Sequence, residues 1–120
     1  MFNISKNGII TLNRGDTVKL PLFINAGTEM NPVRYELKDS DKIYLGVMEN
    51  NAPFERAIIK KVYTKEDINE NGDVVVEFKS EDTCNLIPDD YYYEIKLEFT
   101  YEGSYGINTI VPTTKFTIIE

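Results

Sequence analysis

One short stretch has the residue types and the spacing of a metal-binding loop. Its candidate oxygen ligands alternate along the chain: Asp67, Asn69, Asn71 and Asp73. Calcium favours this spacing because the chain can curl around one ion, with a glycine such as Gly72 at the sharp bend. The motif fails at its end, where the position that needs a bidentate glutamate holds Phe78. We therefore predict a polar hairpin turn here, with no metal ion and no other cofactor.

The rest of the chain offers little for catalysis. It has no histidine, which excludes every His-dependent triad, dyad and zinc site. The single cysteine, Cys84, excludes an intramolecular disulfide and a thiolate zinc site, and we expect it to be buried or half-buried. No phosphate loop and no dinucleotide glycine pattern occurs. The sequence therefore predicts a protein that is not an enzyme.

Aromatic residues that fall outside the predicted core faces are better candidates for function. With one methionine they form the predicted interface set: Phe23, Tyr44, Met48, Tyr92 and Tyr105. Tyr, Phe and Met are enriched at the centres of protein interfaces. Residues 14–16 match the integrin-binding tripeptide Arg-Gly-Asp, but a tripeptide occurs often by chance, and we assign the glycine and the aspartate to a turn before a strand.

The candidate side chains must be positioned by a β-sheet. The longest alternating run, residues 88–101, predicts the central strand of that sheet. One side of this run is expected to face the core: Tyr91, Tyr93, Ile95, Leu97 and Phe99. The opposite side, which includes Glu94 and Glu98, is expected to face water. Tyr91 follows a Pro-Asp-Asp turn, where β-sandwich domains place a corner tyrosine that ties a crossing loop to the strand.

Shorter alternating segments predict the other strands, at residues 8–12, 18–24, 35–37, 43–47, 57–63, 73–78, 107–111 and 115–119. Pro21 cannot donate to a ladder, so its strand is predicted to lie at an edge or to carry a bulge. Pro112 is expected to end the strand before it. Single helical turns are predicted at residues 64–70, capped by Thr64, and at residues 80–83.

Size and charge narrow the range of partners. A chain of 120 residues has room for one domain, and no run approaches the roughly 20 apolar residues of a membrane helix or has the build of a signal peptide. The net charge is −7, and residues 61–120 hold five Lys/Arg against thirteen Asp/Glu. Because phosphate binding depends on Lys/Arg clusters, we expect no nucleic-acid partner, and because no apolar run is long enough to span a bilayer, we expect no membrane partner. The acidic residues either keep the fold soluble or face a basic partner.

Seven or so strands at intervals near ten residues, without a helical segment of useful length, predict the fold class. We expect an all-β protein: an immunoglobulin-like antiparallel β-sandwich, built as a single domain over residues 1–120.

Several stretches of the chain resemble the immunoglobulin-like N-terminal domain of phage baseplate upper proteins and small virion accessory proteins of phages that infect Gram-positive bacteria. They are Arg14-Gly15-Asp16-Thr17, residues 73–78, Ser80-Glu81-Asp82-Thr83, Leu86-Ile87-Pro88, Tyr91-Tyr92-Tyr93-Glu94-Ile95 and Lys115-Phe116-Thr117-Ile118-Ile119. The resemblance implies a virion protein made in the bacterial cytoplasm, and it carries over no catalytic residue.

The resemblance leaves the place in the virion open. In the baseplate family a long C-terminal region follows this domain, whereas the present sequence stops at Glu120. We therefore expect a capsid decoration protein that docks on the lattice of the major capsid protein and can form homo-oligomers there. A tail or baseplate component is the first alternative. A carbohydrate- or cell-surface-binding module is the second.

Overall fold

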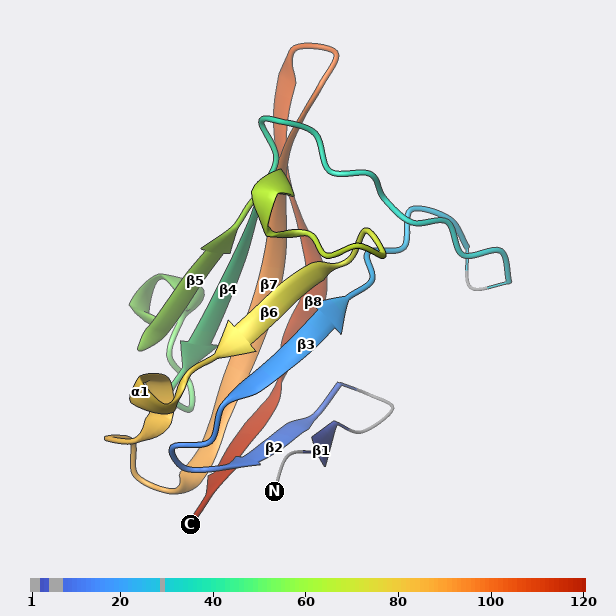
Figure 1. Ribbon diagram of the computed structural model, residues 1–120. Helices are drawn as coiled ribbons and strands as arrows, with labels where there is room; N and C mark the ends of the chain where they lie inside the picture. The colour runs from blue at the N-terminus through green and yellow to red at the C-terminus, as the bar shows by residue number, and fades with distance from the viewer. Residues whose placement is uncertain (1–2, 5–7, 29) are drawn as a thin grey trace.

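The computed structural model describes residues 3–4, 8–28 and 30–120, and it consists of two β-sheets packed face to face (Figure 1). The larger sheet has six strands in the order β1 (Asn3–Ile4), β2 (Ile10–Asn13), β8 (Ser104–Ile119), β7 (Asp89–Tyr101), β4 (Lys42–Met48) and β5 (Ile59–Tyr63). The smaller sheet pairs β3 (Val18–Leu22) with β6 (Val74–Phe78). The prediction of an all-β, sandwich-like fold is confirmed.

One strand pair departs from the predicted antiparallel pattern. β2 runs parallel to β8, with Ile10 opposite Phe116 and Asn13 opposite Ile119. The turn after β2 carries the chain into the smaller sheet as β3, so β2 forms no hairpin with its successor and pairs instead with the end of β8. The larger sheet is therefore mixed, and every other strand pair in the described residues is antiparallel.

The predicted central strand is β7, and its alternation is confirmed. Tyr91, Tyr93, Ile95 and Leu97 are buried, and Phe99 is partly buried against the same core. The Tyr91 hydroxyl donates a hydrogen bond of 2.7 Å to the Ile87 carbonyl oxygen, as a corner tyrosine does. β7 therefore holds the core and fixes the loop that leads into it.

Aromatic rings join the two sheets across the core. The ring centroids of Phe78, on β6, and Phe116, on β8, are 5.1 Å apart, and Tyr93 approaches Phe116 edge-on at 6.3 Å. Such tilted pairs stabilise a core beyond the area they bury. The fully buried aliphatic side chains Leu12, Ile43 and Val47 fill the remaining space.

Short helical turns occur where the sequence predicts them. A 3₁₀ turn at Lys65–Asp67 begins at the predicted cap, Thr64, which forms a capping box with Asp67. Another helical turn, α1, spans Ser80–Thr83. A third, at Phe54–Arg56 between β4 and β5, was not predicted, and it shapes the candidate site.

Three local predictions are wrong. Residues 35–37 form no strand; the Tyr35 amide instead bonds the Ile24 carbonyl oxygen at 2.8 Å, within a loop that packs on the core. Pro112 does not end a strand, because register shifts of β8 against Tyr93–Lys96 form a bulge, where a missing donor is tolerated. Cys84 is exposed, at the end of α1.

Candidate functional site

Four strands of the larger sheet present the candidate site on the face that points away from the smaller sheet. Tyr44 on β4 lies directly opposite Val62 on β5 and Lys96 on β7. Residues directly opposite each other on antiparallel strands share a face, so this row of side chains crosses the sheet. Glu98 continues the row along β7, and Tyr105 on β8 lies opposite Thr100 on the same face. We call Tyr44, Val62, Lys96, Glu98 and Tyr105 the outer patch.

Glu98 fixes the two tyrosines of the outer patch. Its Oε2 accepts a hydrogen bond from the Tyr44 hydroxyl at 2.9 Å and another from the Tyr105 hydroxyl at 3.3 Å. The hydrogen bond to Glu98, with desolvation second, raises the pKa of the Tyr44 phenol. Desolvation and the Glu98 charge raise the pKa of the Tyr105 phenol. The two hydrogen bonds to Glu98 hold both rings in place on the sheet.

Apolar surface lies beside these polar contacts. Val62 is 53% exposed and Tyr105 is 65% exposed. Ile107, on the same face opposite Glu98, is 51% exposed. Aromatic and aliphatic side chains beside a few polar groups are a composition found at protein-binding surfaces.

The connection from β4 to β5 covers the other end of this face. A Cβ atom on Gly46 would lie 2.8 Å from the Phe54 ring and 3.1 Å from the Ala57 Cβ, so the connection packs directly on the β4 backbone. The Lys96 ammonium lies 4.8 Å from the centroid of the Phe54 ring, a cation–π contact that links the connection to the outer patch.

The prediction that Met48 is an interface residue is wrong. Met48 is only 2% exposed although it lies outside the main core cluster. It is on the same face as Gly46, two residues along β4, at the end where the connection folds back. Strand alternation assigns the correct face, but it cannot show that a following loop returns to cover that face. Tyr92, which lies directly opposite Met48, is half-buried.

Phe23, the remaining member of the predicted set, lies elsewhere. It follows β3 in the smaller sheet and does not join the outer patch. The Arg34 guanidinium lies over its ring, with Cζ 5.3 Å from the centroid, and the same guanidinium bonds Asp73 Oδ1 at 2.8 Å. The structure therefore brings Tyr44 and Tyr105 together, leaves Tyr92 partly covered and separates Phe23.

The residues that resemble a calcium loop form a hydrogen-bonded turn. Asn69 Oδ1 accepts from the backbone amides of Asn71 and Asp73 at 2.9 and 3.0 Å. Asp67 Oδ2 accepts from the Thr64 amide at 2.8 Å, and Asp73 is paired with Arg34. These oxygens serve the turn, and the described residues contain no group of three or more His, Cys, Asp or Glu placed to hold a metal ion.

Sequence reasoning did not select Val62, Lys96 or Ile107 as interface residues, although alternation assigns Lys96 to the outward side of β7. The alternation of β5 is hard to recognise because Lys61 occupies a position on the core side, where its ammonium bonds Asp82 Oδ2 at 2.7 Å. With Lys61 assigned to that side, Ile59 and Tyr63 become the core positions and Val62 points outward. The spacing of Ile59 and Tyr63 is the signal that identifies Val62.

No family model matches the chain, and searches of the curated proteins and of the solved structures return no match. Within the described residues, none of the helices is long and apolar enough to cross a bilayer.

Proposed function

We propose that this protein is a non-catalytic structural protein that docks on a partner protein through the outer patch. The observation that carries the proposal is the pair of tyrosines held by Glu98 beside the exposed Val62. Rings that are already ordered lose little conformational freedom on binding, and aromatic side chains dominate the energetics of protein interfaces. A sheet face also offers a rigid surface on which a lattice of identical subunits can repeat one contact.

The partner that we propose is the major capsid protein of a phage, with this protein as a head-decorating subunit. Support comes from the resemblance of the sequence to phage virion accessory domains. The outer patch would meet an apolar surface of the shell that also carries polar groups for Lys96 and Glu98. A tail or baseplate position is the alternative within the same class, because the resemblance includes baseplate proteins.

Co-sedimentation of the purified protein with undecorated capsids and, separately, with tails tests this proposal. We expect saturable binding to capsids, with a fixed number of copies per capsid, and none to tails. Binding to tails alone would move the protein to the baseplate. Binding to neither particle would overturn the virion assignment.

A further inference from the structure

The side of β8 that faces away from β7 is an open sheet edge over much of its length. β2 pairs only with Phe116–Ile119, and in the described ranges no other strand pairs with this side of residues 104–113. The hairpin that contains this edge projects beyond the neighbouring strands, as the orange tip in Figure 1 shows. Backbone donors and acceptors along such an edge can bind another extended chain.

Apart from Pro112 and the bulge beside it, this edge lacks the protection that natural edge strands carry, charged side chains above all. Residues 103–114 form a run of twelve without a charged side chain, in a chain that is 28% charged. The other long edge of the same sheet, β5, carries Lys60 and Lys61, and lysine is a common means of blocking edge-to-edge pairing. Along β8, Tyr105 and Ile107 are instead exposed. The β5 edge therefore carries lysines, whereas the β8 edge carries exposed uncharged side chains.

A groove runs beside the open edge. It has a volume of about 440 Å³, and its walls are residues 22–25, at the end of β3, and residues 108–111 of β8. None of these residues is charged. In the described residues β3 pairs only with β6, so the groove lies between two strands that each have one free side.

We propose that two copies of this protein pair through the β8 edges, antiparallel and about a two-fold axis, and that each hairpin tip enters the groove of the other copy. Antiparallel pairing of one strand with itself is symmetric, so it closes as a dimer. Each copy carries a net charge of −7, and the uncharged run is where two such copies can meet without repulsion. The projecting hairpins let the edges meet before the bodies of the two copies do. This inference is independent of the proposed docking through the outer patch.

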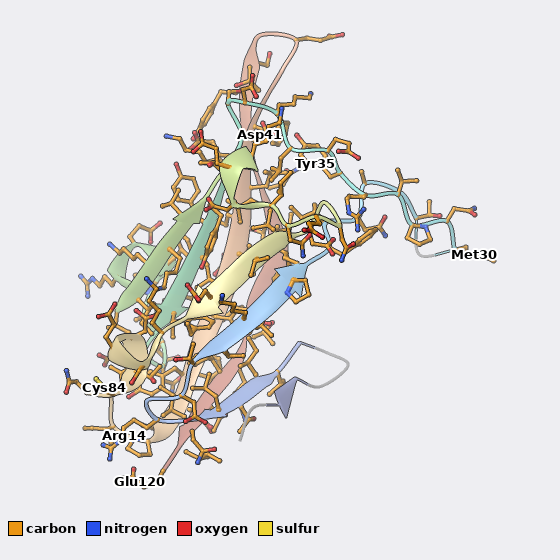
Figure 2. The ribbon with its side chains drawn as sticks, viewed as in Figure 1. Arg14, Met30, Tyr35, Asp41, Cys84 and Glu120 are labelled. Atoms are coloured by element: carbon orange, nitrogen blue, oxygen red, sulfur yellow. The ribbon has the colours of Figure 1, made fainter. Side chains whose placement is uncertain are left out.

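The geometry of a two-fold axis gives a direct test. One residue of β8 must face its own copy across the axis, with Cα atoms about 4.5–5.5 Å apart, a separation that a disulfide can bridge. Cys84, at the far end of the molecule from the hairpin tip (Figure 2), is first replaced by serine. Single cysteines are then placed at Ile107, Asn108 and Thr109, and Lys60→Cys on β5 serves as the control. We expect a cross-linked dimer from at least one β8 position and none from Lys60→Cys.

A matched pair of charge substitutions completes the test. Ile107→Lys and Val62→Lys make the same change at similarly exposed positions on one face, near opposite edges of the sheet. In sedimentation equilibrium the wild type and Val62→Lys should approach twice 13.8 kDa as concentration rises. Ile107→Lys should weaken the dimer at least about tenfold, because two lysines would be brought close together. A wild type that stays monomeric, or a dimer that neither cross-links through β8 nor responds to Ile107→Lys, would overturn the proposal.

Discussion

At the scale of single residues, Gly46 decides how much of the outer face is free. It has no side chain, and the Phe54 ring occupies the space where a Cβ atom would lie. The connection from β4 to β5 can therefore pack on the strand, and Lys96 is drawn toward the Phe54 ring. The uncovered remainder of the face is the outer patch.

Gly46→Ala should lower the free energy of unfolding by about 1–3 kcal/mol, as expected when a methyl group is forced into a well-packed contact. The new methyl would lie 2.8 Å from the Phe54 ring, closer than real Cβ contacts allow. Urea unfolding of the single variant, of Phe54→Ala and of the double variant measures the effect. In the Phe54→Ala background the added methyl group should lower the free energy of unfolding by much less. An equal loss of unfolding free energy in the two backgrounds would show that the clash is not with Phe54.

Tyr35 makes stability depend on pH above the neutral range. Its hydroxyl donates to Asp41 Oδ2 at 2.7 Å, and Asp41 is fully buried (Figure 2). Desolvation first, and the hydrogen bond to Asp41 second, raise the pKa of Tyr35 from 10.0 to about 12. A raised pKa in the folded state means that the contribution to stability is complete below pH 10 and is lost as the pH rises from 10 to 12.

The urea midpoint should therefore fall between pH 8 and pH 11, and the fall should be smaller in Tyr35→Phe. At pH 8 this variant should itself be less stable by about 1–3 kcal/mol, because the buried Asp41 carboxylate loses a donor. The buried Tyr63, Tyr91 and Tyr93, whose pKa values are also raised, should account for the fall that remains. An equally large fall in the wild type and in Tyr35→Phe would contradict a role for Tyr35.

At the scale of elements, Tyr91 connects the crossing loop to β7. Tyr91→Phe keeps the ring in the core but removes the bond to the Ile87 carbonyl oxygen, so stability should fall by about 0.5–1.5 kcal/mol. Tyr92→Phe makes the same change next to it, at a hydroxyl for which the described residues provide no bond. Urea unfolding of both variants separates the two effects. A loss in Tyr92→Phe that equals the loss in Tyr91→Phe would contradict the special role of Tyr91.

The sequence predicts strands well where two-residue alternation meets a buried face, as in β7, and it predicts turns where Thr64 or Asn71-Gly72 supplies the local signal. Prediction from the sequence fails where contacts between residues far apart in the chain determine burial or strand length. Met48 is buried because a loop returns across the sheet and covers it. β8 continues beyond Pro112 because its register with β7 includes a bulge at that point. Part of the candidate site is predictable for the same reason. Alternation places Glu98 on the outward side of β7, but its bonds to both Tyr44 and Tyr105 depend on the register of three strands.

At the scale of the whole molecule, two adjoining surfaces, which meet at Tyr105, have separate proposed roles. The outer patch lies on the face of the larger sheet, and the open edge of β8 lies at the border of that sheet. A lattice contact through the face leaves the edge free for a second copy, so docking and dimerisation are compatible. Val62 on β5, opposite Tyr44, lies away from β8, so Val62→Lys tests docking without altering the pairing edge.

The most direct test of the central claim is the affinity of Val62→Lys for the undecorated capsid, measured beside that of Met30→Lys. Met30 is 91% exposed on a loop away from the outer patch (Figure 2), so Met30→Lys makes the same change of charge outside the proposed interface. Val62→Lys should weaken binding at least about tenfold, because a charge would be buried in the contact, whereas Met30→Lys should bind like the wild type. Equal binding by the two variants would contradict docking through the outer patch.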